Sequence, residues 1–301
     1  MPYVAKGSYG CIFRPHIACK DKKQSTTKVI GKVFEDVEEF HSEMNSFKMI
    51  DRIDPQHEFT LENKGSCYTK TKPRKSDEIN MCPFMGVGYS YPQILMEYGG
   101  IDLGRYMYTH KGDEKKLLAL MSKFLPVIHG LRKMSEHRVV HQDITVNNIT
   151  IKGKRVYLID FSLMKRMNDI FGEDNRPIRE HMYPYYPPEY SSDKKKRMNK
   201  YNFTIPGLNN TRFADIFHLF QVNMDKDVSN KVATRVDIFS LGIIFGILFM
   251  WSGASVKTTR NKKIKELWSI IQGMLAFDAR KRTSPSMLAK KMEALFGEAT
   301  E

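Results

Sequence analysis

Cysteine is scarce in this sequence, and its spacing shows no recurring pair. The 301 residues include four cysteines and no C-x-x-C motif: Cys11, Cys19, Cys67 and Cys82. Zinc sites and small disulfide-stapled domains are recognised by closely and regularly spaced cysteines, so the sequence predicts neither. Cys67 and Cys82 could approach each other, but we expect a free, reduced pair. A reducing compartment, cytoplasmic or nuclear, is therefore expected.

The sequence also lacks a secretory leader and a long hydrophobic run. Met1 and Pro2 lead almost at once into a glycine-containing turn, which is not the pattern of a signal peptide. The apolar run at 238–251 is shorter than the roughly 20 residues that cross a bilayer. A helix that is apolar on all sides also suits the centre of a large domain. We expect this run to be buried and the chain to have no membrane span.

Acidic residues are outnumbered by basic ones. The sequence has 34 Asp and Glu against 48 Lys and Arg, for a net charge of +14. Such a surface favours acidic partners or proteins associated with nucleic acid. The basic runs, such as 194–197, carry no interleaved aromatic residues, so a nucleic-acid-binding module is an alternative supported by charge alone. The simplest interpretation is a solvated basic face.

The composition is otherwise that of a globular protein, with 41% hydrophobic and 27% charged residues. A chain of 301 residues exceeds the usual size of a single domain, so we expect one large domain or two lobes.

Two apolar runs within residues 139–164 each end in a polar cluster that holds an aspartate. The first cluster, H-Q-D, ends at Asp143 and is followed five residues later by Asn148, and the second, D-F-S, begins at Asp160. Phosphoryl transfer needs a carboxylate that faces the attacking hydroxyl, and carboxylate and amide oxygens that hold a metal. Ordinary strand ends with Asp and Asn in turns would show the same residues without this chemistry.

The stretch resembles the catalytic loop and metal loop of protein kinases, H-x-D-x-x-x-x-N followed by an apolar strand and D-F. The resemblance implies an α+β, two-lobed fold, with a small β-rich N-lobe at 1–98 and a larger helical C-lobe at 99–301. It implies transfer of the γ-phosphoryl of ATP to a protein hydroxyl, of Ser or Thr, with Mg²⁺ or alternatively Mn²⁺. Asp143 would be the base, and Asn148 and Asp160 the metal ligands.

The opening of the chain predicts a strand, a glycine turn and a returning strand, Y-V-A-K-G-S-Y-G-C-I-F. Glycine lets backbone N–H groups approach phosphates, and the turn resembles the kinase glycine loop with Ala5 in place of its first glycine. Lys32, in a short β-like run, resembles the lysine that holds the α- and β-phosphates. A helix predicted over 35–50 carries its expected partner, Glu43, with Glu39 one turn earlier as the fallback.

A glycine joint after Tyr98 resembles the kinase hinge. By this resemblance Met96 walls the adenine pocket, backbone groups from Glu97 to Gly99 pair with adenine, and Asp102 reaches a ribose hydroxyl. The implied catalytic residues are Asp143, Lys32, Asn148 and Asp160. The implied nucleotide-binding residues are Gly7, Gly10, Ile12, Lys32, Glu43, Met96, Glu97, Tyr98, Gly99 and Asp102.

Two stretches lie outside the resemblance. Residues 51–83 show little periodicity and predict an irregular insertion, and residues 190–231 predict a second insertion beside the substrate region. Two strands are expected over 85–98, and one amphipathic helix over 115–137, in which Pro126 should cause a kink or the loss of one hydrogen bond.

Three motifs in the second half resemble those of kinases that act on peptides. The run 183–189 resembles the A-P-E end of the activation segment, and its Glu189 is expected to pair with Arg282. Asp237 opens a run that resembles D-x-W-S-x-G, and it is expected to cap the backbone of the catalytic loop. These motifs argue against a small-molecule phosphotransferase, which shares only the H-x-D and Asn pattern. A pseudokinase scaffold is the other alternative, and the retained catalytic residues argue against it.

Other positions depart from the family pattern. Ser162 replaces a glycine, and Thr145 stands where serine/threonine kinases have a lysine. Gln142 replaces the arginine that binds a phosphate on the activation segment of many kinases, and residues 163–190 contain no Ser or Thr. We therefore expect a protein substrate to be modified without prior phosphorylation of the enzyme, unless Arg166 or Arg179 receives a phosphotyrosine. The run Y-G-G-I-D-L is similar to haspin-type kinases and to kinases of large DNA viruses. The viral resemblance implies a viral protein, located in the host cell or in the virion.

Overall fold

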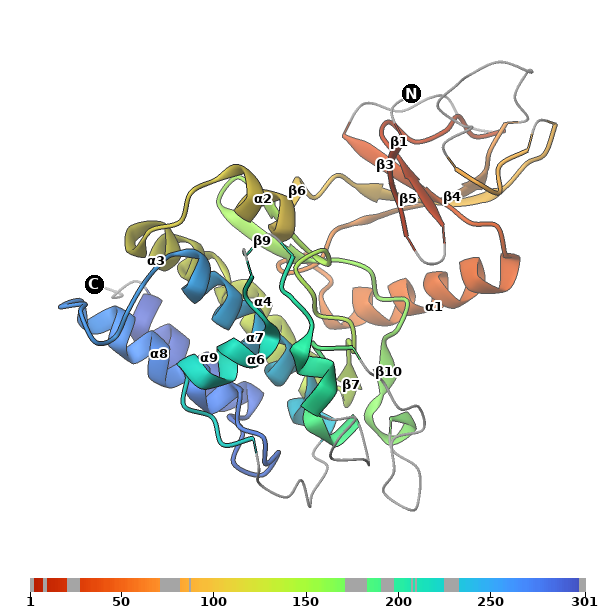
Figure 1. The fold of residues 1–301 in the computed structure, drawn as a ribbon. Coiled ribbons are helices and arrows are strands. Elements are labelled where there is room, and N and C mark those ends of the chain that lie inside the picture. The colour runs from red at the N-terminus through yellow and green to blue at the C-terminus, as the bar shows by residue number, and fades with distance from the viewer. Residues whose placement is uncertain are drawn as a thin grey trace. The chain divides into compact units, whose positions relative to one another are not determined.

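The computed structural model describes residues 3–7, 10–20, 28–70, 82–86, 88–170, 183–190, 198–206, 208, 210–224 and 233–297 (Figure 1). The chain divides into two compact units, Met1–Gly99 and Gly100–Glu301. The division falls one residue after the lobe boundary expected at residue 98. The first unit is built on a sheet and the second on helices, as the predicted α+β fold requires.

An antiparallel sheet forms the body of the first unit. Its strand order is β1-β2-β3-β5-β4, and the strands are β1 (Tyr3–Lys6), β2 (Cys11–Phe13), β3 (Val29–Val33), β4 (Asn63–Tyr68) and β5 (Pro92–Glu97). Ile12, Lys32 and Ile94 are cross-strand partners in this register. Partners project their side chains on the same face, so the sheet sets Lys32 beside the strand that returns from the glycine turn.

Helix α1 (Val37–Ile53) corresponds to the helix predicted over 35–50. It begins after Asp36, whose carboxylate accepts the N–H of Glu38 at 2.6 Å, as an N-cap does. It ends at Asp54, a fully buried residue whose carboxylate accepts the N–H groups of Glu58, Phe59 and Thr60. The Asp36 cap explains where the helix begins, and the Asp54 carboxylate holds the chain that follows its end.

The prediction of an irregular insertion over 51–83 is wrong in part. This stretch contains the last turn of α1 and the whole of β4, which pairs with β5. Strand β4 has the sequence N-K-G-S-C-Y and contains Gly65 at φ 99°, so no apolar alternation marks it as a strand. Within the described part of 85–98, only β5 is a strand, because β4 occupies the place of its expected partner. Residues 71–81 lie outside the described residues.

The cysteine predictions are also wrong. All four cysteines are paired, Cys11 with Cys82 and Cys19 with Cys67. The partners are 71 and 48 residues apart in sequence, so only the folding of the sheet brings them together. The expected reducing compartment loses the support that unpaired cysteines gave it, and a cytoplasmic or nuclear location stays a prediction.

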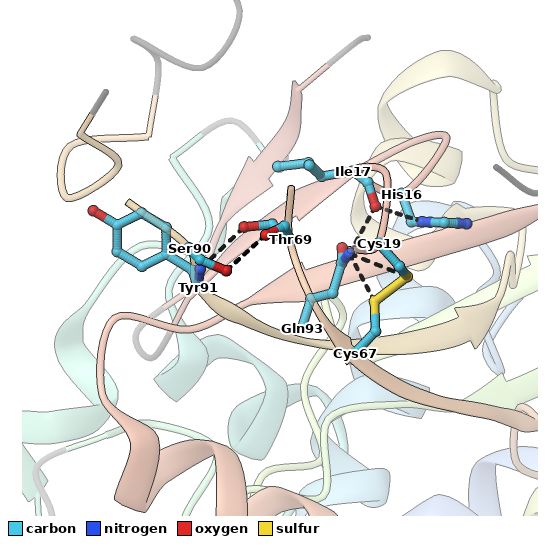
Figure 2. The surroundings of a disulfide bond; sticks show 8 residues. All are labelled: His16, Ile17, Cys19, Cys67, Thr69, Ser90, Tyr91 and Gln93. Atoms are coloured by element: carbon cyan, nitrogen blue, oxygen red, sulfur yellow. Dashed lines mark hydrogen bonds between the residues drawn. A yellow bond between two sulfur atoms is a disulfide. The ribbon is translucent and has the colours of Figure 1, made fainter. Parts of the chain in front are cut away.

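The chain after β2 covers the sheet face opposite Lys32. We call residues 16–20 the covering segment. It reaches β4 at its far end, where the Lys20 N–H donates to the Tyr68 carbonyl at 2.9 Å. Gln93 of β5 donates to the Ile17 carbonyl at 2.7 Å and lies against the Cys19–Cys67 disulfide (Figure 2). A Cβ on Gly31 would lie 2.5 Å from Gln93 Oε1, so this position of β3 needs glycine.

Helices dominate the second unit (Figure 1). They are α2 (Leu103–Thr109), α3 (Glu114–Lys123), α4 (Leu125–Glu136), α6 (Phe213–Leu219), α7 (Val236–Trp251), α8 (Lys262–Met274) and α9 (Pro285–Phe296). The helix predicted over 115–137 is in fact two helices, α3 and α4, separated at Phe124. Pro126 lies in the first turn of α4, where its missing N–H costs nothing.

Short strands and single turns of 3₁₀ helix complete the second unit. Strands β6 (Ile101–Asp102), β8 (Ile149–Lys152) and β9 (Arg155–Leu158) form one sheet, and β7 (Val139–Val140) pairs with β10 (Lys165–Arg166). The 3₁₀ turns are η1 (Met167–Asp169), η2 (Pro188–Tyr190), η3 (Lys200–Asn202) and η4 (Ala233–Arg235).

Helix α7 is the buried centre of the second unit. With the preceding turn, Ala233–Trp251 is long and apolar enough to cross a membrane by length and composition, and 78% of its most apolar window is buried inside the protein. Neighbouring helices account for this burial: a Cβ on Gly246 would lie 2.5 Å from the side chain of Ile216 in α6. The burial expected for 238–251 is observed.

The described part of 190–231, the stretch predicted as an insertion beside the substrate region, contains regular structure and buried side chains. Turn η3 and helix α6 lie in this stretch, and Tyr201 and Phe217 are fully buried. Their rings pack against each other, and both pack against Phe239 of α7 and Phe277. Residues 191–197, 207, 209 and 225–231 of the stretch lie outside the described residues.

The predicted pair of Glu189 and Arg282 is present. Both side chains are fully buried, and the guanidinium donates to both carboxylate oxygens, at 2.6 and 2.9 Å. Arg282 also donates to the carbonyls of Ala276 and Arg235. Buried charges need such partners, so this pair ties turn η2 to the chain before α9.

The disulfides generate the first testable prediction. Replacing Cys19 and Cys67 together by Ser should lower the free energy of unfolding by about 2–4 kcal/mol, because the unfolded chain regains the freedom of a long closed loop. Chemical unfolding with and without reductant measures this. Reductant should destabilise the parent and have a smaller effect on the double variant. Four free thiols in the denatured, unreduced protein would contradict both disulfides.

The buried ion pair generates the second. Glu189→Ala and Arg282→Ala should each destabilise by about 3–5 kcal/mol, because each leaves an uncompensated charge in the core. The double variant should lose less than the sum of the single losses. Urea unfolding of the four proteins gives the coupling energy, and additive losses would show that the pair is not formed.

Candidate functional site

The first unit holds the predicted lysine and its carboxylate partner. Lys32 Nζ in β3 lies 2.6 Å from Glu43 Oε2 in α1, and both side chains are buried. Glu43, rather than the fallback Glu39, is therefore the partner. Desolvation raises the pKa of Glu39, while the charge of Lys32 acts on it in the opposite direction. The ion pair fixes the ammonium group at one position on the sheet face.

The glycine turn lies at the end of β1 and the start of β2. The Gly7 N–H donates to the Gly10 carbonyl at 2.8 Å, and residues 8 and 9 lie outside the described residues. A Cβ on Gly10 would lie 2.3 Å from the Val33 carbonyl oxygen, so only glycine fits there. A cavity of about 920 Å³ adjoins the turn, and its lining includes Gly7, Gly10 and the carboxylates of Glu35, Asp36 and Glu39.

Two backbone N–H groups at the end of β5 are already hydrogen-bonded, while the expected hinge contacts with adenine stay a prediction. The Glu97 N–H donates to the Glu62 carbonyl and the Tyr98 N–H to the Lys28 carbonyl, at 3.0 and 2.9 Å. These two donors are used within the sheet, so a donor to adenine would have to come from Gly99. Met96 is the register partner of Ile30 in β3, and its contact with adenine stays a prediction.

Asp102 lies at the start of the second unit and caps helix α2. Its Oδ1 accepts the N–H of Arg105 at 2.8 Å. One carboxylate oxygen therefore has a structural partner, and the expected ribose contact stays a prediction.

The catalytic loop follows β7 and is held from α7. The N–H groups of His141 and Gln142 donate to the two carboxylate oxygens of Asp237, at 2.7 and 3.0 Å. The predicted cap by Asp237 is thus present. The Asp143 N–H donates to His141 Nδ1 at 3.2 Å, a role of His141 that its place in the motif did not indicate.

Asn148 orients the carboxylate of Asp143. Its Nδ2 donates to Asp143 Oδ2 at 2.6 Å and to the Asp143 carbonyl at 3.0 Å. This amide group is thereby committed as a donor to Asp143, and Asn148 Oδ1 is the atom of this side chain that could ligate a metal. Asp143 and Asn148, the two residues predicted from the H-x-D-x-x-x-x-N spacing, therefore form a hydrogen-bonded pair.

A β-hairpin brings Asn148 next to Asp160. Strands β8 and β9 pair with Ile149 opposite Leu158, and the Ile159 N–H donates to the Asn148 carbonyl at 3.0 Å. Asp160 follows at φ 62°, a conformation that non-glycine residues seldom adopt outside functional or strained sites. The structure thus brings together Asp143, Asn148 and Asp160, the three catalytic residues predicted for the second unit.

The oxygen atoms of this arrangement suit Mg²⁺. Mg²⁺ is held in nucleotide sites by one or two protein oxygens, with substrate phosphates and waters completing an octahedron. Asp160 supplies a carboxylate and Asn148 an amide oxygen. The described residues contain no group of three or more His, Cys, Asp or Glu that could hold a metal ion, so such an ion would depend on substrate oxygens for the rest of its ligands.

Burial shifts the pKa values of His141 in the catalytic loop and of Asp237 beneath it. Desolvation lowers the pKa of His141 to about 4, against the opposing charge of Asp160. Desolvation also raises the pKa of Asp237 to about 6, against its two hydrogen bonds from the loop. At neutral pH, His141 is therefore uncharged and can accept the Asp143 N–H, while Asp237 is ionised and accepts two N–H groups.

Tyr183 of the activation segment is electrostatically coupled to Asp143. Burial raises the pKa of Tyr183, and the negative charge of Asp143 raises it further. Its ring packs against Tyr185 and Tyr186. No local pattern in the sequence indicated this coupling. Residues 171–182 of the segment lie outside the described residues.

The opposed shifts of Asp237 and His141 generate a prediction about pH. As pH falls from 6 to 4, the folded protein gains a proton on Asp237, which favours folding, whereas the unfolded chain gains one on His141, which opposes it. Asp237→Asn leaves only the histidine effect. Its free energy of unfolding should therefore fall more steeply than that of the parent, by up to about 1.4 kcal/mol per pH unit. Urea unfolding at several pH values tests this, and parallel curves would contradict it.

Comparison with known proteins agrees with this geometry. No curated protein matches the chain closely enough to be counted as a relative. A family model, described as protein tyrosine and serine/threonine kinase, matches residues 2–204, which is more than half of the chain. The match includes Lys32, Glu43, Asp143, Asn148 and Asp160. With that match and this arrangement of residues, the chain belongs to the protein tyrosine and serine/threonine kinase family.

Proposed function

We propose that the protein transfers the γ-phosphoryl group of ATP, with Mg²⁺, to a serine or threonine hydroxyl of a protein substrate. The observation that carries the proposal is the hydrogen-bonded pair of Asn148 and Asp143 beside Asp160. One amide group holds Asp143 by its N–H atoms, and its oxygen is the atom that would ligate the metal. An arrangement of this kind serves positioning and electrostatics, which supply most of the catalysis in phosphoryl transfer.

Each residue then has a defined task. Asp143 orients the attacking hydroxyl and accepts its proton on the carboxylate. Lys32, held by Glu43, binds the α- and β-phosphates, and Gly7 and Gly10 offer backbone N–H groups to them. Asn148 and Asp160 would hold Mg²⁺, which neutralises phosphate charge when bound. The formed ion pair of Lys32 and Glu43 supports an active enzyme over a pseudokinase.

The choice of Ser or Thr rests on the prior that most protein kinases modify these residues, because the catalytic loop carries the signature of neither class. Residues 143–148 show none of the signatures of tyrosine kinases. Thr145 stands where serine/threonine kinases have a lysine, and it is buried, with its carbonyl accepting the Asn148 N–H at 3.1 Å. The net charge of +14 favours acidic protein substrates.

The deciding experiment is transfer from labelled ATP to a panel of acidic and basic proteins, with Mg²⁺ and with chelator. The parent should label a protein only with Mg²⁺, and analysis of the phosphorylated residues should find phosphoserine or phosphothreonine. Labelling of small molecules alone, or of nothing, would contradict the proposal.

Replacing the base tests the mechanism. Asp143→Asn should slow transfer by roughly 10²–10⁴-fold, the usual value of a positioned base, while ATP binding persists because Lys32 and Asp160 are unchanged. The matched control is Asp113→Asn, at the exposed N-cap of α3, where Asn caps as well as Asp. Turnover of Asp143→Asn near the parent rate would exclude Asp143 as the base.

A further inference from the structure

Gln142 connects the catalytic loop to two other segments through its side chain. Its Nε2 donates to the Leu163 carbonyl at 3.0 Å, and its Oε1 accepts the hydroxyl of Tyr190 at 2.9 Å. Its backbone N–H donates to Asp237 at 3.0 Å. Leu163 begins and Tyr190 ends the stretch that runs from the metal loop through η2. We call this set of contacts the Gln142 junction.

The backbone at Gln142 is held in an uncommon conformation. Its φ is 65°, in the left-handed region that a long side chain rarely occupies. Such a conformation persists where surrounding contacts determine it. The donor and acceptor of the side chain and the backbone N–H are all engaged, and the residue is 9% exposed. The junction is therefore a fixed part of the fold next to Asp143.

Tyr190 is an equally fixed partner. It is 2% exposed and its ring stacks on Tyr186 at 4.9 Å. The preceding residue, Glu189, is bound by Arg282. Burial keeps the pKa of Tyr190 well above its ordinary value, so the hydroxyl is a neutral donor at all working pH values. A movement of η2 would therefore displace the hydroxyl group that donates to Gln142.

The chemistry of the junction explains why arginine is not used at this position. A guanidinium group has only donors, so it could not accept the hydroxyl hydrogen of Tyr190. Glutamine offers a donor for Leu163 and an acceptor for Tyr190 in one neutral side chain. The residue type that departs from the family pattern thus satisfies both partners with the hydroxyl of Tyr190 acting as donor.

We propose that Gln142 is a positioning residue, which holds both ends of residues 163–190 against the catalytic loop by neutral hydrogen bonds and so keeps Asp143 in place without a phosphate. This inference rests on the proposed kinase function. A phosphate receptor elsewhere would be an alternative arrangement: Arg166 is exposed in β10, and Arg179 lies outside the described residues.

The test pairs Tyr190→Phe with Gln142→Asn, which tolerates a positive φ but is too short for both contacts. Each variant should lower kcat about tenfold, the effect of one buried hydrogen bond, and leave the KM for ATP within about twofold because Lys32 and Glu43 are unchanged. The double variant should lose no more than Gln142→Asn alone. Phosphatase-treated parent should show no lag and full initial rate.

The matched control is Tyr201→Phe, which also loses a buried hydroxyl bond, to the Tyr186 carbonyl at 2.9 Å. Its effect should multiply with that of Gln142→Asn, because its hydroxyl donates to a carbonyl and not to Gln142. If Tyr190→Phe and Gln142→Asn also multiply, if either variant keeps the parent kcat, or if the parent needs phosphorylation within 163–190, the proposal is wrong.

Hydrogen exchange separates this inference from the proposed function. The N–H groups of Met164, Tyr186 and Tyr190 are hydrogen-bonded within their turns, and they should exchange about tenfold faster in Tyr190→Phe and in Gln142→Asn. This measurement needs no substrate. A parent that transfers no phosphate but shows the coupled exchange would overturn the proposed function alone, and unchanged exchange would overturn the junction alone.

Discussion

The buried carboxylate of Asp237 is the interaction on which the second unit's site depends. It lies in α7, an almost entirely apolar helix in the centre of the unit. Burying a carboxylate is costly unless it is hydrogen-bonded, and here the two loop N–H groups provide those bonds. The same bonds hold the N–H groups of His141 and Gln142, the two residues directly before Asp143, and so fix the backbone that leads into Asp143. The catalytic loop is therefore as rigid as the helix beneath it.

The segment 183–190 is held by side chains from beneath as well as by its own tyrosines. Lys200 donates to the Pro187 carbonyl, Tyr201 to the Tyr186 carbonyl, and Ser240 of α7 to the Tyr185 carbonyl. Two of these donors, Lys200 and Tyr201, come from the stretch predicted to be an insertion beside the substrate region. Its described part therefore supplies buried support for the segment 183–190. Rigid support of this kind is what precise positioning requires.

The first unit is stabilised in a different way from the second. Its sheet presents Lys32 on one face, whereas the other face is covered by a segment without helix or strand of its own. Ile17 and Cys19 of this segment are buried against the sheet, and small units often rely on covalent links in addition to such packing. Both disulfides lie on this covered face, at Cys11 of β2 and at Cys19 of the covering segment. They hold the sheet that sets the register of Lys32.

The sequence by itself determined the chemistry-bearing residues and most of the helices. Lys32 with Glu43, Asp237 with the loop, and Glu189 with Arg282 were predicted from motifs, and each contact is present. These predictions succeeded because residue types at fixed spacings report directly on local chemistry. Their functional roles stay predictions.

Only the tertiary structure decided strand β4, both disulfides, the support given by residues 198–219 and the Gln142 junction. Strand β4 is polar along its length and is a strand because β5 lies beside it. The cysteine partners are 48 and 71 residues apart, and Gln142 and Tyr190 are also distant in sequence. Contacts of this kind depend on sheet register and helix packing, which no pattern of neighbouring residues encodes.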